Sequence, residues 1–197
     1  MPRQPTGRKK EAILDAAVVE IAAHGYHGTT VAMIARRAGV ADGTIYLDFQ
    51  NKEEVLVSLF DRAMDRFTAL GAGELARLED PAARLARIIE LHLELVGGDR
   101  DLAIITQVEL RHSVHFLDQL SRAKVGQYLQ VIGGVIAEGQ QAGLWRRDLE
   151  AGLLAKAVFG ILDEMATDWV LSRRNTRLAA RADAVTRIVM GALRPEA

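Results

Sequence analysis

The sequence contains no cysteine, and this excludes disulfide bonds, zinc–thiolate sites and thiol catalysis. Its apolar runs are short and broken by charge, as where Glu94 and Asp101 flank residues 95–98, so no stretch is long enough to cross a bilayer. The first ten residues are polar and basic, without an apolar core. We therefore expect no signal peptide, no membrane association and a cytoplasmic location.

The motifs of common enzyme classes are also missing. The chain has no Gly-x-Ser-x-Gly, no glycine-rich phosphate loop and no His-Glu-x-x-His. His112 and His115 stand three residues apart on a possible helix, but no third ligand follows at a telling spacing. We therefore expect a protein that is not an enzyme and holds neither a metal nor a cofactor.

The chain has enough apolar residues to bury a core, because 49% of its residues are hydrophobic and 26% are charged. The formal net charge is −1, but it is spread unevenly. Residues 1–52 hold seven basic and five acidic residues, whereas the remainder holds 18 basic and 21 acidic residues. The sequence thus predicts a mildly basic head and a mildly acidic body.

Helical periodicity dominates, and no alternating strand pattern appears. Apolar residues form one stripe over residues 14–21, and Gly25 is expected to end this helix in a left-handed conformation. Later helices begin at residues that favour N-caps, namely Asn51, Asp80, Asp99 and Asp148. We predict an all-α fold of about nine helices, with a head in residues 1–52 and a body in residues 53–197.

Two short helices and a tight turn are predicted in the head. Ala35 supplies a small residue for close helix contact, Gly39 suits a turn with positive φ, and Ile45 anchors the next helix. This spacing is compatible with a helix-turn-helix that binds DNA, but helical hairpins of other kinds also show it.

A more specific signal surrounds the turn. Residues 25–30 read Gly-Tyr-His-Gly-Thr-Thr, residues 34–40 read Ile-Ala-Arg-Arg-Ala-Gly-Val, residues 43–49 read Gly-Thr-Ile-Tyr-Leu-Asp-Phe, and Lys-Glu-Glu follows at 52–54. Together these runs resemble the signature of the TetR family of repressors over about the first 55 residues. The resemblance implies a homodimer that places its third helix in the major groove of operator DNA and binds a small effector in a helical body.

Within this resemblance, the third helix carries the residues expected to meet DNA. Gly43 lets the start of the helix approach the backbone, and Thr44 can reach a base or a phosphate. Tyr46 offers a hydroxyl to a phosphate and a ring to a thymine methyl group. Ile45 and Phe49 are expected in the core.

Phosphate contacts are also expected around the second and fourth helices and at the N-terminus. Lys52 stands at the start of the fourth helix, and Thr29 or Thr30 stands at the start of the second. Four basic residues can form an arm that follows the DNA or remain a solvated tail: Arg3, Arg8, Lys9 and Lys10.

The head departs from the family pattern at two positions. Ala41 stands where Ser or Thr is common, so helix capping can pass to Asp42, whose carboxylate suits a helix N-terminus. Asp48 stands where an aromatic or basic residue is common, so a phosphate contact there is not carried over.

The body resembles a particular group within the family. Residues 95–111 and 159–170 are similar to the bodies of the fatty-acid-degradation repressors, and this implies a long-chain acyl-CoA that releases the protein from DNA. Such a ligand needs an apolar tunnel, with cations and donors near its mouth. The candidate contacts are Leu95, Ile104, Ile105, Gln107, Val108, Arg111, Phe116, Arg122, Lys124, Tyr128, Ile132 and Phe159.

The last two helices are expected to form the dimer interface, with Leu153, Ala157, Trp169, Ile188 and Val189 as possible members. Two alternatives remain open. The same fold can respond to another hydrophobic molecule, as a regulator of drug efflux or catabolism. A lipid carrier with a vestigial head is the other alternative.

Overall fold

The computed structural model describes residues 6–109, 121–172 and 176–195. These residues form nine α-helices and one 3₁₀ helix, and no strand occurs among them. The helices are α1 (Thr6–Gly28), α2 (Val31–Ala38), α3 (Asp42–Ile45), α4 (Lys52–Leu75), α5 (Pro81–Gly97), α6 (Arg100–Gln107), α8 (Ser121–Gln141), α9 (Ala151–Leu171) and α10 (Ala182–Ala192), with η2 (Leu178–Arg181) before the last. The prediction of an all-α fold is confirmed.

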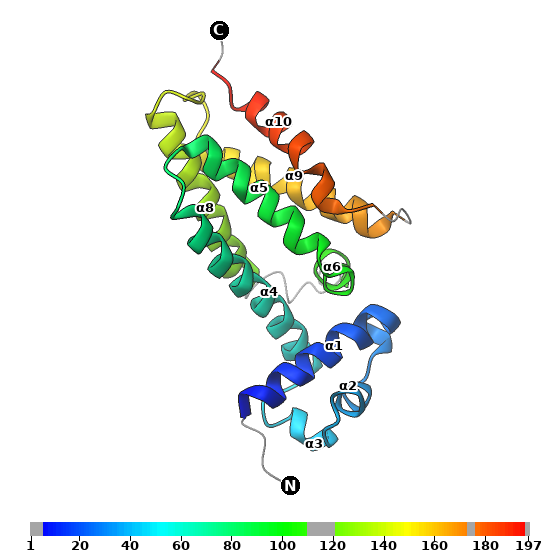
Figure 1. Cartoon of the computed structure of the whole chain (residues 1–197). Coiled ribbons are helices and arrows are strands. Elements are labelled where there is room, and N and C mark those ends of the chain that lie inside the picture. Colours follow the sequence, from blue (N-terminus) through cyan, green and yellow to red (C-terminus); the bar gives the residue numbers. More distant parts are fainter. Residues whose placement is uncertain (1–5, 110–120, 173–175, 196–197) are drawn as a thin grey trace.

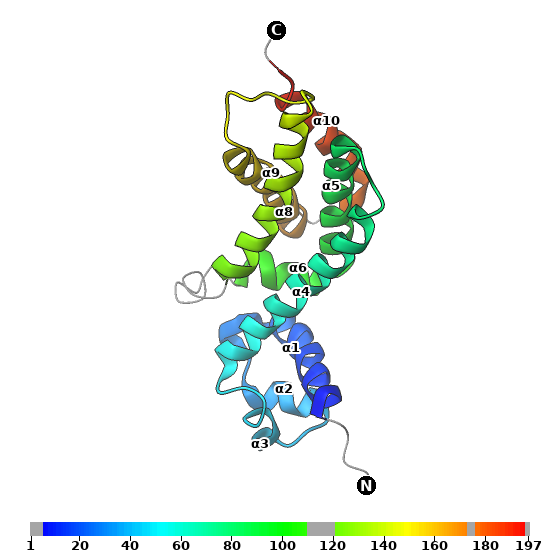
Figure 2. The same cartoon turned by 90° about the vertical axis from the view of Figure 1, so that its left-hand side faces the viewer.

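The molecule is elongated, with a small head at one end and a larger helical body at the other (Figures 1 and 2). Helices α1, α2 and α3 form the head, and α4 runs from it into the body. Helices α5, α8, α9 and α10 make up most of the body. Helix α6 lies between the body and α1 of the head.

Two separate hydrophobic cores correspond to the head and the body. The head core includes Val55, Leu56 and Leu59 from the first two turns of α4. Further along the same helix, Met64 and Phe67 pack against the body core. Because α4 belongs to both cores, a rigid helix joins head and body, and no flexible linker separates them.

Side-chain caps explain where several of the helices begin. Asn51 accepts a hydrogen bond from Glu54 N at 2.8 Å, and Asp80 and Asp99 cap α5 and α6 in the same way. The expected cap at Asp148 is wrong, because α9 begins at Ala151 and Asp148 is instead paired with Arg146 at 2.6 Å. The prediction that Gly25 ends the first helix is only partly right. Gly25 has φ 72° but an extended ψ of 163°, and the helix resumes for one more turn.

Candidate nucleic-acid interface and effector-binding core

The turn between α2 and α3 has the geometry that the spacing predicted. Thr30 caps α2 by accepting from Met33 N at 3.2 Å. Gly39 ends the helix in the left-handed conformation, at φ 67° and ψ 32°, and Val40 N then donates to Ala35 O at 3.0 Å. A side chain at residue 39 would be strained in this conformation, so glycine is needed for the turn that aims α3.

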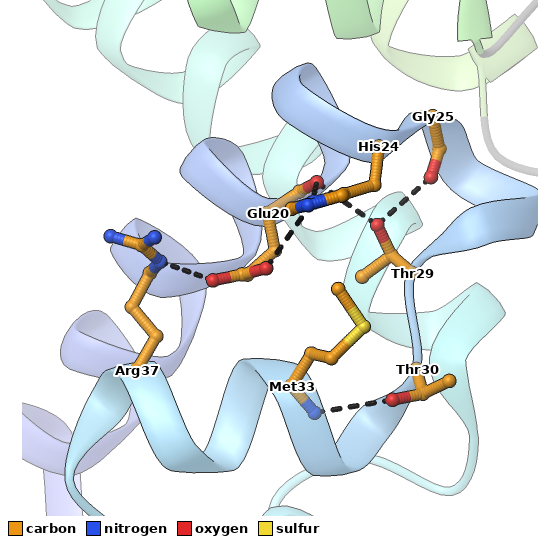
Figure 3. Close-up of polar contacts among 7 residues, drawn as sticks. All are labelled: Glu20, His24, Gly25, Thr29, Thr30, Met33 and Arg37. Carbon is orange, nitrogen blue, oxygen red and sulfur yellow. Dashed lines mark hydrogen bonds and ion pairs between the residues drawn. The ribbon is translucent and has the colours of Figure 1, made fainter.

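A buried carboxylate holds α2 against α1. Glu20 on α1 is almost fully buried and pairs with the guanidinium of Arg37 on α2, while the ring of His24 lies 3.4 Å from the other carboxylate oxygen (Figure 3). The hydrogen bond from Arg37 lowers the pKa of Glu20, so the carboxylate stays charged and the pair persists. This contact ties the two helices together.

The third helix turns its apolar residues inward and its DNA-binding candidates outward. Ile45 and Phe49 are buried in the head core, as expected. Gly43 faces open space, Thr44 is half-buried, and 57% of Tyr46 is exposed. The three DNA-contact candidates on α3 and at its C-cap are therefore wholly or partly accessible to solvent.

Leu47 is a surface residue that the sequence reasoning missed. It follows Tyr46 directly, and 83% of its side chain is exposed. A fully solvated leucine beside the third helix contributes nothing to the core. Its place between the buried positions Ile45 and Phe49, two residues from each, was the available signal.

Several residues expected at the DNA surface take other roles in the structure. Only 1% of Thr29 is exposed, and its hydroxyl lies within hydrogen-bonding distance of Glu20 O and Gly25 O (Figure 3), so it is removed from the candidates while the exposed Thr30 stays. Lys52 donates to Tyr26 O and Thr29 O, both at 2.7 Å. Two of the three hydrogens of its ammonium group are therefore used at the corner where α1 leads into α2.

The basic arm also requires correction. Arg8, Lys9 and Lys10 lie inside α1, which begins at Thr6, so they project from a helix and do not form a free arm. Lys10 lies over the ring of Phe49, 5.4 Å from its centre. Arg3 lies outside the described residues.

The start of α3 has no side-chain cap. Ala41 occupies the N-cap position without a side-chain bond, and Asp42 stands in the first turn and is exposed. Asp42 thus provides the negative charge that a helix N-terminus favours, without replacing the missing cap. Asp48 is half-buried just beyond the helix.

The body contains one polar pair deep in its core. His92 on α5 and Tyr128 on α8 are each only 6% exposed, and His92 Nδ1 lies 3.1 Å from the Tyr128 hydroxyl. The rings of Phe67 and Phe159 contact this pair edge-on. Burial lowers the pKa of His92 to about 4 and raises that of Tyr128, so both are neutral at pH 7.

The apolar ligand candidates divide into those that belong to the body core and those that do not. Ile132 belongs to the body core, and Ile104, Val108 and Phe159 pack against it. Ile105 belongs to the head core instead, and Leu95 is half-buried outside both cores, so these two are withdrawn as ligand contacts.

The polar candidates are already engaged or lie outside the description. Gln107 is buried and accepts from the hydroxyl of Thr167 on α9 at 3.0 Å. Lys124 pairs with Asp65 on α4, which raises the pKa of the lysine. Arg111, Phe116, His112 and His115 fall outside the described residues, as does the side chain of Arg122.

Helix α6 and the residues just after it connect the body to the head. Glu109 accepts a hydrogen bond from Tyr26 N at 2.9 Å, and its carboxylate lies against Gly25. Leu102 and Ile105 pack on the head core, whereas Ile104 packs on the body core. A displacement of α6 would therefore move the segment around Gly25 and Tyr26, which leads into α2 and α3.

The outer surface of α9 and α10 carries exposed apolar and small residues. Leu153, Ala157 and Ile188 are exposed there, as the dimer hypothesis requires. Trp169 and Val189 were wrong as interface members, since both are buried within the single chain. Trp169 donates to Thr176 O at 2.6 Å inside the body.

A helix-turn-helix with an exposed third helix, joined through one shared helix to a helical body, is typical of helix-turn-helix transcriptional regulators. In the described part of the chain no helix is long and apolar enough to span a membrane. The same residues contain no cluster of acidic or histidine side chains suited to a metal ion.

Comparison with known proteins agrees with this class. The chain belongs to the TetR family, because residues 13–59 match the model for bacterial regulatory proteins of the tetR family and residues 60–192 match the C-terminal region of YsiA-like proteins. It is 39% identical to the fatty acid metabolism regulator protein of Bacillus subtilis over 92% of this chain and 93% of the relative.

Two solved structures are similar over nearly the whole chain. FadR from Bacillus subtilis, in complex with stearoyl-CoA, has a TM-score of 0.88 and 38% identity, with 93% of this chain and 98% of that chain covered. FadR from Bacillus halodurans, a fatty acid degradation regulator, has a TM-score of 0.87 and 37% identity, with coverage of 93% and 99%. These relatives are transcriptional regulators, and the similarity extends well beyond the head.

Proposed function

We propose that this protein is a cytoplasmic repressor of fatty-acid-degradation genes that binds operator DNA as a homodimer and is released by long-chain acyl-CoA. The observation that carries the proposal is the similarity of the entire chain, body included, to a regulator whose structure holds stearoyl-CoA. A shared head alone would support only DNA binding, because helical bodies with different effectors can carry the same head.

On the DNA side, the accessible surface of α3 enters the major groove. Thr44 and Tyr46 contact bases and phosphates, and Gly43 permits close approach of the helix to the backbone. Thr30 and Asp42 are also exposed and complete the candidate contacts. Arg8 and Lys9, projecting from α1, add charge that attracts phosphates.

On the effector side, the acyl chain occupies the body core between α4, α5, α8 and α9. Apolar residues of this core line the chain, namely Ile104, Val108, Tyr128, Ile132 and Phe159. Lys124, half-buried beside the exposed Asp65 of α4, marks the side at which the charged coenzyme remains in solvent. The low aromatic content, 5% of the sequence, suits an aliphatic ligand better than a flat aromatic drug.

Two chains associate through the exposed surface of α9 and α10. A two-fold axis through this surface brings two heads to the same side of the dimer, where they reach successive major grooves about 34–36 Å apart. Acyl-CoA acts by population shift: it binds better to the dimer whose heads stand at the wrong separation, and affinity for DNA falls by the same coupling factor. Helix α6 and Glu109 transmit this change to the head.

The test is a titration of the purified protein onto labelled DNA from upstream of its own gene and of β-oxidation genes, at one fixed salt concentration. It is performed with stearoyl-CoA, with free CoA and with free stearate. We expect specific binding that stearoyl-CoA abolishes and free CoA does not.

Specific binding that is indifferent to stearoyl-CoA would preserve the repressor and overturn the fatty-acid assignment in favour of another hydrophobic effector. Binding of stearoyl-CoA with no specific DNA site in a genome-wide operator search would support the lipid carrier instead.

A further inference from the structure

The buried pair of His92 and Tyr128 lies where four helices of the body meet. Phe67 from α4 and Phe159 from α9 enclose it, with ring centres 5.2 and 6.3 Å from His92 and 4.9 and 6.0 Å from Tyr128. Polar groups in such an apolar cluster are costly unless their hydrogen bonds are satisfied.

One atom of the pair is left without a partner. His92 Nδ1 is paired with the Tyr128 hydroxyl, but His92 Nε2 is buried and has no hydrogen-bond partner among the residues that the structure describes. A buried ring nitrogen without a hydrogen-bond partner brings no benefit to the fold. The arrangement is explained if a ligand supplies the missing partner.

Hydrogen-bond accounting identifies what that partner must be. A neutral imidazole carries one donor and one acceptor nitrogen. If the Tyr128 hydroxyl donates to Nδ1, only the Nε2 hydrogen remains unpaired. In the opposite tautomer, the hydroxyl hydrogen and the Nε2 lone pair both remain unpaired. The first arrangement leaves fewer groups unsatisfied, so Nε2 presents a donor, and the complementary ligand group is an acceptor.

The surroundings restrict that acceptor further. A carboxylate would have to leave water for a cluster of aromatic rings, at a high cost in desolvation. A neutral carbonyl oxygen meets the same donor at a much smaller cost. Among the groups of a fatty acyl-CoA, the thioester carbonyl is neutral and stands where the coenzyme joins the alkyl chain.

Helix α8 shows the same order of groups as an acyl-CoA. Lys124, Tyr128 and Ile132 stand four residues apart, so they share one face of the helix. Lys124 is half-buried in an ion pair with the exposed Asp65, Tyr128 is in the buried polar pair, and Ile132 is fully buried in the apolar core. Charge, hydrogen-bonding group and hydrocarbon therefore follow one another inward along α8.

We propose that His92 Nε2 donates a hydrogen bond to the thioester carbonyl of the bound acyl-CoA, and that Tyr128 holds the imidazole in the required tautomer. This inference rests on the proposed function and deepens it. It makes His92 a specificity residue that selects thioesters over ligands of equal hydrophobicity that lack a neutral carbonyl at this depth.

The experiment compares two ligands by calorimetry on the full-length protein. Stearoyl-CoA carries the carbonyl, and S-octadecyl-CoA, its thioether analogue, has a methylene group in that place. We expect the natural protein to bind stearoyl-CoA roughly fivefold more tightly than the thioether, the value of one typical hydrogen bond. In His92→Phe this preference should disappear, whereas His92→Gln, which retains a donor, should recover part of it.

Phe67→Leu is the matched control, because it changes the packing around the polar pair but keeps both of its hydrogen-bonding groups. It should weaken both ligands equally and leave the preference intact. Thermal unfolding without ligand shows whether each variant folds. His92→Phe leaves the buried Tyr128 hydroxyl without its partner, so a folded protein with a lower unfolding temperature is expected.

Equal affinity of the natural protein for the two ligands would overturn the inference, as would a preference that survives in a folded His92→Phe. If neither ligand binds the natural protein, the proposed effector itself is wrong. A folded His92→Phe that binds both ligands with one affinity would support the role assigned to His92.

Discussion

His92 shows how one buried residue links stability to pH. Its pKa falls from 6.5 to about 4 because burial disfavours the charged ring. The unfolded chain takes up this proton below about pH 6.5, whereas the folded chain does so only near pH 4. The contribution to stability is therefore complete above the unfolded pKa and is lost as the pH falls toward the folded one.

The first prediction follows from that linkage. Between pH 7 and pH 4.5, His92 should cost the natural protein about 2–3 kcal/mol of unfolding free energy, since each pKa unit corresponds to about 1.4 kcal/mol. Urea unfolding at the two pH values measures this, and His92→Phe should lose that much less stability on acidification. Identical losses in both proteins would show that His92 titrates normally when folded.

Leu47 provides a prediction about DNA recognition. The change Leu47→Ala should leave stability within about 0.5 kcal/mol of the natural protein, since the side chain is 83% exposed. It should weaken operator binding by about 1 kcal/mol, roughly fivefold, if the leucine meets thymine methyl groups. The salt dependence of binding should not change, because no phosphate contact is removed.

The control for Leu47 is Leu144→Ala, which removes an exposed leucine from the segment between α8 and α9. Operator affinity should be unchanged in this variant. Equal affinities for the natural protein and Leu47→Ala would remove Leu47 from the recognition surface.

At the scale of elements, the two glycines around α3 have opposite roles. Gly39→Ala forces a side chain into a left-handed conformation and should lower stability by about 1 kcal/mol. Gly43→Ala lies within a helix with open space around it, so stability should hold or rise by up to about 1 kcal/mol. Operator binding should nevertheless fall in Gly43→Ala, because the new methyl group stands where the helix meets DNA.

Thermal unfolding and operator titration on both variants separate these roles. If Gly43→Ala binds the operator as tightly as the natural protein does, the third helix does not approach DNA at that point. Unchanged stability in Gly39→Ala would show that the turn tolerates a different conformation.

Helix α6 carries the prediction about coupling. Glu109→Gln weakens the charge-assisted contact with Tyr26 N but touches neither the proposed DNA surface nor the ligand cluster. Affinity for the operator should change little, and the factor by which stearoyl-CoA lowers it should shrink by about 0.5–2 kcal/mol. Operator titrations with and without stearoyl-CoA give this factor. Glu79→Gln, an exposed residue between α4 and α5, is the control and should leave the factor intact.

At the scale of the whole molecule, association determines DNA binding. Ile188→Asp places a charge on the exposed apolar surface of α10, and we expect a monomer by light scattering and a loss of operator affinity. Leu70→Asp, on the exposed side of α4, should remain dimeric. A dimeric Ile188→Asp with normal operator binding would place the interface elsewhere.

Local chemistry allowed much of the architecture to be read from the sequence. Periodicity predicted an all-α chain, and Asn51, Asp80 and Asp99 cap their helices as expected, because a cap depends on residues within one turn. The left-handed turn at Gly39 is local in the same sense. The family resemblance, carried by residues 25–54, is confirmed by the matches over residues 13–59 and 60–192.

Contacts between distant residues could not be read in this way. Thr29 and Lys52 looked like phosphate ligands, but both bond to backbone carbonyl groups at the corner of α1 and α2. The carbonyls lie 4 and 9 residues away from Thr29 and 23 and 26 residues away from Lys52. Trp169 looked like a surface anchor and is buried. The spacing of apolar residues along a helix does not show whether a residue packs inside its own chain or against a second chain.

The sequence by itself determined the class of protein, since helix type, turn geometry and the recognition helix all depend on neighbouring residues. Only the tertiary structure decided which of these residues remain free to bind. It joined His92 to Tyr128 across 36 residues and Tyr26 to Glu109 across 83. Such pairs are formed when helices pack, because burial and hydrogen-bond satisfaction are properties of the assembled core.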